Sequence, residues 1–484
     1  MLFNSLDFAI FLPIVFSLYW FATNKQIQLQ NLLIVLASYI FYGWWDARFL
    51  LLIVFSTLVD YSIGLKLGSE SRTDKRKLLL TLSLCINLGL LGFFKYYNFF
   101  IESFQDAFSF FGVNLSLGTL EIILPVGISF YTFQTLSYTI DVYRGKLVAT
   151  KNFVAFSAFV SFFPQLVAGP IERATNFLPQ FEKKRQFDYA AAIDGCKQIL
   201  WGLIKKVVIA DNCAEYVNLI FANSADYSGS TLLLGSVLFA FQIYGDFSGY
   251  SDIAIGTARL FGFSLMQNFA YPYFSRDIAE FWRRWHISLS TWFRDYLYIP
   301  LGGSKVGLTK RIRNTFVIFL VSGFWHGAKW TFVIWGGLNA LYFLPLLLSN
   351  KNRRYLGVVA DQSMWPSLVE VWKILTTFAL TVLAWVFFRA DSVAHALSYL
   401  AEIFSSSIFS LPKFPGIGQL PVTIILIIAF LLIEWNGRRN QYAIEKFFND
   451  KPLIIRWIAY FLLLSIIYFF GNYSSQLEFI YFQF

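Results

Sequence analysis

A succession of long apolar runs, separated by short polar interludes, constrains this sequence more than any other feature. A helix that crosses a bilayer needs about 20 mostly apolar residues, with a range of about 17–25. The candidate runs are residues 8–23, 28–45, 49–68, 78–94, 122–140, 153–169, 207–222, 231–245, 250–263, 314–328, 330–348, 371–388, 422–433 and 453–470. Some are too short to cross alone, so the pattern predicts roughly 11–12 transmembrane helices plus re-entrant and interfacial helices. The expected fold class is an all-α polytopic membrane protein, with residues 1–484 forming a single integral-membrane domain.

Composition agrees with a membrane protein and argues against several other classes. Only 14% of the residues are charged, against about 25% in soluble proteins. The net charge of +10 is typical of the excess of Lys and Arg in cytoplasmic loops, and its scattered clusters do not predict nucleic-acid binding. Cys85, Cys196 and Cys213 predict neither a disulfide framework nor a zinc site. Because residues 1–7 lack a basic segment, run 8–23 is expected to be a retained helix.

Clusters of basic residues predict which loops face the cytoplasm. They lie at residues 72–77, 182–185 with 205–206, 305–313, 351–354 and 438–439. Counting runs back from the first cluster places the N-terminus outside. Counting forward gives a conflict at run 153–170, which contains Pro164 and Pro170. Since proline interrupts helical hydrogen bonding, we predict a re-entrant or broken segment here, with a plain kinked span as the alternative.

A second conflict in the count falls at residues 250–300. We predict one amphipathic helix over residues 275–292, lying at or dipping into the cytoplasmic face. In such a helix Trp282 and His286, four residues apart, would share a face.

Two of the three histidines in the chain directly follow a tryptophan. His286 closes the block FWRRWH, and His326 lies in the block SGFWHG within the apolar run 314–328. An ionisable side chain inside such a run is a functional candidate, and histidine exchanges protons near neutral pH. The alternatives are helix packing for His326 and a lipid headgroup contact for His286. No third ligand stands at a recognisable spacing, so no metal site is predicted.

A further polar stretch, QIYGDFSGYSD at residues 242–252, interrupts the apolar pattern. Asp246, Ser248 and Asp252 are candidate cavity-lining residues, and the last two are spaced to face one cavity. Close helix packing through Gly245 and Gly249 is a compatible interpretation. The sequence has no glycine-rich phosphate loop and no G-x-S-x-G motif, which leaves base catalysis by histidine as the available chemistry.

Several blocks together resemble the membrane-bound O-acyltransferase family, and within it the membrane subunits of bacterial alginate O-acetyltransferases. The blocks are PVGISFYTFQ (125–134), GPI (169–171), QIYGDFSGY (242–250), FWRRWHISLS (281–290), GFWHG (323–327) and the closing FIYFQF (479–484). The signature core spans about residues 242–348.

The resemblance implies a bundle of helices around a central tunnel in the bacterial inner membrane. Acetyl-CoA would enter from the cytosol as a substrate, with no permanently bound cofactor. The essential histidine of the family corresponds to His326, with Trp325 beside it in the cavity, and the earlier polar partner corresponds to His286. A periplasmic acetyltransferase-like partner protein and a polysaccharide acceptor such as alginate are also implied.

The basic segment beside His286 is the candidate donor site. Arg283 and Arg284 would attract the phosphates of coenzyme A, with Trp285 adjacent to them. The alternative is that these arginines contact lipid headgroups or pair with Glu280 and Asp277.

Other functions fit the same apolar pattern. The acceptor could be peptidoglycan or another exopolysaccharide instead of alginate. A polysaccharide or lipid transporter is the alternative from another class, although transporters usually carry internal repeats and none is visible. A structural scaffold for a secretion complex would need no base within the membrane.

Overall fold

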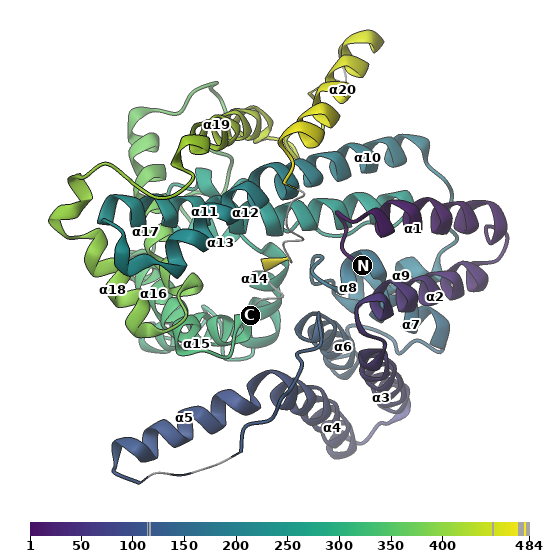
Figure 1. Cartoon of the computed structure of the whole chain (residues 1–484). Coiled ribbons are helices and arrows are strands. Elements are labelled where there is room, and N and C mark those ends of the chain that lie inside the picture. The colour runs from purple at the N-terminus through teal and green to yellow at the C-terminus, as the bar shows by residue number, and fades with distance from the viewer. Residues whose placement is uncertain (114, 116–117, 448–449, 473–478, 481–484) are drawn as a thin grey trace. The chain divides into compact units, whose positions relative to one another are not determined.

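The computed structural model describes residues 1–113, 115, 118–447, 450–472 and 479–480. These residues form helices joined by loops, with no strand among them (Figure 1). The chain divides into two compact units. Unit 1 comprises Met1–Ala192 with Thr257–Met266, and unit 2 comprises Ile193–Gly256 with Gln267–Phe484. The all-α fold class is confirmed.

Unit 1 is built from the N-terminal helices, in which the label η marks a short 3-10 or π helix. They are α1 (Leu6–Ser17), η1 (Leu18–Ala22), α2 (Ile27–Asp46), η2 (Ala47–Phe49), α3 (Leu50–Ser69), α4 (Thr73–Leu91), η3 (Gly92–Tyr96), α5 (Tyr97–Phe110), α6 (Ile128–Tyr143), α7 (Phe153–Ser161), α8 (Phe163–Leu166) and α9 (Ala174–Glu182).

The run at residues 153–170 is broken, as its prolines predict. α7 ends at Ser161, Phe162 takes a non-helical conformation, and the single turn of α8 carries Pro164. Ser38 stabilises the break, because its Oγ accepts a hydrogen bond from the Phe163 backbone N–H at 3.0 Å.

Two helices pass from one unit into the other, and the rest of the chain belongs to unit 2. The two are α10 (Tyr189–Leu203) and α12 (Gly229–Leu260). The others are η4 (Ile204–Ala210), α11 (Asp211–Ala222), η5 (Ser224–Asp226), η6 (Pro272–Phe274), α13 (Ile278–Arg284), α14 (Ile287–Phe293), η7 (Arg294–Tyr298), α15 (Leu308–His326), α16 (Trp330–Leu348), α17 (Leu368–Arg389), α18 (Val393–Ile403), η8 (Ser406–Phe409), η9 (Ile417–Gln419), α19 (Leu420–Gly437) and α20 (Leu453–Phe470).

α12 corrects the prediction of two separate runs at residues 231–245 and 250–263, because it is one helix of 32 residues. The polar stretch between the runs stays helical since its carboxylates have buried partners, as in the pair between Asp246 and Lys206. Gly249 also contributes, because a β-carbon there would lie 2.7 Å from the Gly202 carbonyl oxygen on α10. The interpretation of this stretch as a close helix contact is therefore confirmed.

The assignment of Lys205 and Lys206 to a cytoplasmic loop is wrong. Both lie in η4, inside a continuous helical stretch formed by α10, η4 and α11. Their side chains are only 5% and 6% exposed. A buried lysine persists only with compensating charge, and both residues have carboxylate partners.

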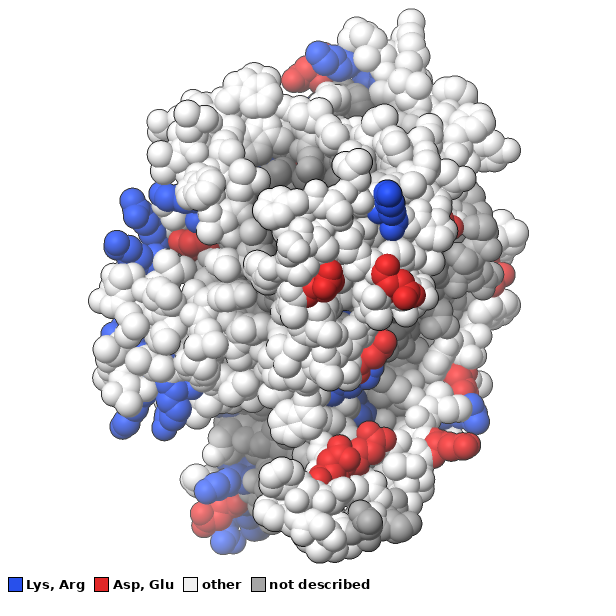
Figure 2. Space-filling view, turned by 60° about the vertical axis from the view of Figure 1, so that its left-hand side comes forward, with Lys and Arg blue, Asp and Glu red and all other residues white. Residues whose placement is uncertain are grey.

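Seven helical stretches of the described residues are long and apolar enough to cross a membrane. They are Ile27–Ser69, Thr73–Phe110, Gly229–Leu260, Trp330–Leu348, Leu368–Arg389, Ile417–Gly437 and Leu453–Phe470. In the face shown in Figure 2, uncharged residues predominate and charged residues form small separated groups. Such a surface suits contact with lipid, so the chain is a multi-pass membrane protein.

Candidate active site

The first Trp-His pair lies at a break between two short helices. α13 (Ile278–Arg284) and α14 (Ile287–Phe293) are separate, and His286 between them has φ 43° and ψ 55°. A residue with a β-carbon rarely adopts this left-handed backbone conformation. The prediction of one helix over residues 275–292 is therefore wrong, and Trp282 and His286 do not share a helical face.

A neighbouring extended segment holds this break in place. The Ile287 N–H donates to the Asn268 carbonyl at 2.9 Å, and the Ser288 hydroxyl donates to Asn268 Oδ1 at 2.9 Å. On the other side of the turn, the Ala270 N–H donates to the Arg284 carbonyl at 2.9 Å. These contacts come from a segment outside the local sequence pattern, so the pattern alone did not reveal the turn.

The second Trp-His pair closes α15, which packs tightly against α16. The two helices meet at Gly323 and Gly336. A β-carbon at either glycine would overlap a backbone carbonyl oxygen of the opposite helix. The absence of side chains at both positions lets the backbones approach closely and fixes the end of α15, where His326 lies.

Aromatic rings surround His326. Its ring centroid lies 5.0 Å from that of Trp325, 5.2 Å from that of Trp335 and 5.3 Å from that of Phe388. The Trp335 ring meets the imidazole edge-on, with an interplanar angle of 90°. This packing leaves the His326 side chain little freedom to rotate.

The fold brings the two predicted histidines together. The ring centroids of His286 and His326 are 6.2 Å apart, and the two residues are 1% and 3% exposed. Trp325 contacts both rings. His286 lies outside the membrane-spanning helices, and burial lowers its pKa from 6.5 to about 3. Its imidazole is therefore neutral at pH 7, with one nitrogen able to donate and one able to accept a hydrogen bond.

The three predicted cavity-lining residues of α12 are buried but have different surroundings. Asp246 pairs with Lys206 Nζ at 2.9 Å, and Asp252 pairs with Lys205 Nζ at 3.0 Å. Ser248 is 1% exposed. Asp252 borders a small pocket of about 10 Å³, room for one water molecule.

Phe247 links α12 to the histidines. Its ring packs edge-on against His286 at 4.6 Å. The described part of the closing FIYFQF block also reaches this region. The Phe479 ring lies 5.8 Å from that of Phe247, and the Ile480 N–H donates to Asp246 Oδ2 at 2.7 Å. Residues 481–484 of that block lie outside the described residues.

Sequence reasoning missed the buried ion pairs beneath this region. Lys205 Nζ also contacts Glu434 Oε1 at 3.2 Å, and Lys206 Nζ contacts Asp211 Oδ1 at 2.8 Å. Each lysine therefore lies between two carboxylates. The spacing of the two lysines gave no signal, because three of their four partners, Asp246, Asp252 and Glu434, lie at least 40 residues further along the chain.

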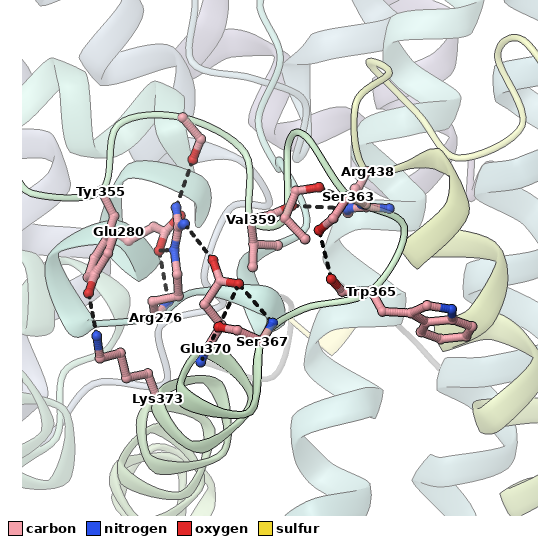
Figure 3. A network of polar contacts seen from close by, with 12 residues as sticks. Arg276, Glu280, Tyr355, Val359, Ser363, Trp365, Ser367, Glu370, Lys373 and Arg438 are labelled. Carbon is pink, nitrogen blue, oxygen red and sulfur yellow. Dashed lines mark hydrogen bonds and ion pairs between the residues drawn. The ribbon is translucent and has the colours of Figure 1, made fainter.

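The predicted donor arginines contact protein groups. Arg283 donates to the carbonyl oxygens of Asn352 at 2.8 Å and Tyr355 at 2.7 Å. Arg284 pairs with Glu280 at 2.9 Å. The predicted pairing of Glu280 is thus seen with Arg284, and its second partner is Arg276, also at 2.9 Å (Figure 3).

Trp285, the third candidate donor residue, is 1% exposed. Its ring stacks on Phe281 with centroids 5.5 Å apart and contacts Trp385 at 5.1 Å. Trp285 is therefore a buried residue of the aromatic core next to His286.

A pocket of about 240 Å³ lies between α14, η7, α15 and α16. Ser322 in its wall is one helical turn before His326. Another wall residue, Trp282, packs against Trp335, which in turn contacts His326. Apolar side chains predominate, with polar groups on several sides. The lining residues are Trp282, Ser290, Phe293, Arg294, Tyr298, Thr315, Ile318, Phe319, Ser322, Phe343, Leu347 and Asn352.

Known proteins resemble this chain over most of its length. The sequence model of the membrane-bound O-acyltransferase family matches residues 44–379. A probable alginate O-acetylase of Pseudomonas aeruginosa is 40% identical over 435 residues, which cover 90% of this chain and 80% of the relative. A peptidoglycan O-acetyltransferase of Helicobacter pylori is 37% identical, with 81% and 77% covered. A teichoic acid D-alanyltransferase of Bacillus subtilis is 27% identical, with 52% and 66% covered.

Proposed function

The chain belongs to the membrane-bound O-acyltransferase family and is an acyltransferase; from this premise we propose that it transfers an acetyl group from cytosolic acetyl-CoA towards a hydroxyl of an extracytoplasmic polysaccharide. The observation that carries the proposal is the buried pair of His286 and His326, with ring centroids 6.2 Å apart. The names of the relatives, which include acetylases of alginate and of peptidoglycan, support acetyl as the acyl group.

His326 is the general base in this proposal. A hydroxyl is a poor nucleophile until a base takes its proton. His326 accepts that proton as the hydroxyl oxygen attacks the thioester carbonyl carbon. The C–S bond then breaks, and the imidazolium returns the proton to the departing thiolate. The products are an ester and free coenzyme A, and no further reactant is needed.

His286 stabilises the charge that develops on the carbonyl oxygen. A neutral imidazole can donate one N–H, and a fixed donor is effective at the oxyanion of an acyl-transfer intermediate. The lowered pKa keeps His286 neutral at pH 7, so it retains one nitrogen that can accept and one that can donate a hydrogen bond. In this proposal His326 acts on the hydroxyl that attacks the carbonyl carbon, and His286 acts on the carbonyl oxygen.

The 240 Å³ pocket is the proposed binding site for the arm of the donor that carries the thioester. Its lining includes Ser290, Thr315 and Asn352, which are suited to the amide groups of that arm. Its apolar walls suit the methylene segments between the amides. Ser322 in its wall is one helical turn before His326 on α15, so the thioester end would point that way.

The acceptor is proposed to be a polymer such as alginate, reached through a periplasmic partner protein, with the chain in the bacterial inner membrane. The 40% identity to an alginate O-acetylase supports the choice of acceptor. The peptidoglycan O-acetyltransferase at 37% identity supports peptidoglycan as the second candidate.

Release of free coenzyme A tests the proposal. The purified protein in detergent is supplied with acetyl-CoA labelled in the acetyl group, with and without oligosaccharides of alginate or of peptidoglycan. We expect thioester consumption, faster with the correct acceptor. Transport of the oligosaccharide in proteoliposomes without any thioester consumption would instead support the transporter interpretation.

A further inference from the structure

The loop between α16 and α17, residues 349–367, is held by arginines from distant parts of unit 2. We call it the strap. Figure 3 shows Arg276 and Arg438 reaching this loop, with Tyr355, Val359 and Ser363 among its residues. The guanidinium groups donate mainly to backbone carbonyl oxygens of the strap.

The middle of the strap is anchored at the end of α19. Arg438 donates to the carbonyl oxygens of Val359 at 3.0 Å, Ala360 at 2.9 Å and Ser363 at 2.7 Å. Val359 and Ala360 are buried and pack against Trp435. This part of the strap therefore behaves as a fixed point.

The end of the strap towards the pocket depends on α13. Arg283 donates to the carbonyls of Asn352 and Tyr355. The Tyr355 ring lies under the Arg276 guanidinium, with the Arg276 Cζ 4.4 Å from the ring centroid. Lys373 Nζ donates to the Tyr355 hydroxyl at 2.7 Å. Asn352 is itself a wall residue of the 240 Å³ pocket, so the position of this wall follows the position of Arg283.

We propose that Arg283 is a positioning residue, which sets one wall of the donor pocket through the strap instead of contacting a phosphate of the donor. The inference rests on the proposed function, because it takes the pocket to bind the thioester donor. Both terminal nitrogens of the guanidinium already donate to the strap. A phosphate would have to compete with two well-formed charge-assisted hydrogen bonds.

A comparison of two donors distinguishes positioning from phosphate binding. The KM is measured in the full-length protein for acetyl-CoA and for S-acetyl-pantetheine, which has the same thioester arm but no phosphate. Loss of the two hydrogen bonds in Arg283→Ala should raise KM about tenfold for both donors, with kcat little changed. A rise with acetyl-CoA alone would overturn the inference and assign Arg283 to the phosphates.

Two further variants keep the test decisive if Arg283→Ala folds poorly. Tyr355→Ala removes an uncharged strap residue, and it should also raise KM for both donors. Arg353→Ala removes a positive charge from an exposed position next to Asn352, and it should change KM by less than about twofold. An unchanged KM in Tyr355→Ala, or an equal rise in Arg353→Ala, would contradict the role of the strap.

The wild-type reaction separates failure of the inference from failure of the proposed function. If the wild-type protein releases no coenzyme A from acetyl-CoA, the proposed function itself is wrong. If it does, and the effect of Arg283→Ala depends on the phosphates, only the positioning role is wrong.

Discussion

The three histidines of the chain lie in different environments, and these environments favour a catalytic role for two of them and a structural role for the third. His286 and His326 are buried and face each other across 6.2 Å. His395, on α18, lies 3.0 Å from the Ser224 hydroxyl and 3.8 Å from the Asp391 carboxylate. A histidine that already has a hydroxyl and a carboxylate beside it fits a local structural role, whereas the buried pair is the one that the proposed transfer reaction uses.

Replacement of His326 by alanine should abolish transfer while the protein still inserts into the membrane. Loss of a general base typically costs about 10²–10⁴-fold in rate. The rate of coenzyme A release is compared with that of His395→Ala, which removes a histidine away from the pair and should keep near-normal activity. Normal activity in His326→Ala at equal expression would disprove the assignment.

The sequence indicated these candidate residues where a residue type with proton-transfer chemistry also stands in an unusual sequence pattern. A histidine directly after a tryptophan stands out, and both such residues, His286 and His326, lie in the candidate site. Lys205 and Lys206 stand out too, but as an ordinary basic cluster. Apart from the nearby Asp211, their partners are Asp246, Asp252 and Glu434, and no local pattern reports contacts with residues so far along the chain.

At the scale of helices, the site depends on two kinds of close contact. α15 and α16 approach each other where glycines face backbone, and this contact holds His326. η4 packs on α12 and α19 through lysines shared between carboxylates. The first contact depends on close steric fit, and an added β-carbon would disrupt it. The second depends on compensating charges, and the loss of a lysine would disrupt it.

Gly336→Ala should lower the rate about 10²-fold, because a displacement of about 1 Å at a catalytic group is enough for such a loss. A β-carbon at Gly336 overlaps the Phe319 carbonyl oxygen and would push α15 away. Gly337→Ala is the matched control, since its β-carbon lies 3.7 Å from Leu320 Cδ2 in ordinary contact. Equal rates of coenzyme A release in the two variants would refute the role of this contact.

Lys205→Met should destabilise the protein by about 3–5 kcal/mol, because it leaves Asp252 and Glu434 buried without a compensating charge. Thermal unfolding in detergent measures the effect. Lys310→Met, at an exposed position on α15, should leave the unfolding temperature nearly unchanged. Adding Glu434→Gln to Lys205→Met should restore part of the stability, and a further loss in the double variant would contradict the charge argument.

Hydropathy alone predicted the boundaries of two apolar helices correctly. The predicted runs 330–348 and 453–470 coincide at both ends with α16 and α20. The prediction failed where tertiary contacts override the pattern. α12 continues through a polar stretch whose charges are neutralised by η4, and the predicted helix over 275–292 breaks at His286, where residues 268–270 hold the turn.

At the scale of the whole molecule, the single helix α12 makes it simpler to predict which side of the membrane each loop faces. α12 begins at Gly229, shortly after Asp226, and at about 48 Å it is long enough to cross the bilayer once. α13 and α14 are each about 10 Å long and cannot cross. Asp226 and Arg311 should therefore lie on opposite sides of the membrane, and the basic residues near Arg311 predict that its side is the cytoplasm.

Cysteine labelling tests this orientation. In a background without Cys85, Cys196 and Cys213, a cysteine at Asp226 should react with an impermeant thiol reagent in intact cells, and a cysteine at Arg311 should react only after permeabilisation. Labelling of both positions in intact cells would show that α12 does not separate them. Labelling of Arg311→Cys alone would reverse the orientation and place the start of α15 on the side away from the cytosol. In the proposed reaction the donor comes from the cytosol, so the reversed pattern would also remove the proposed route by which the thioester reaches His326.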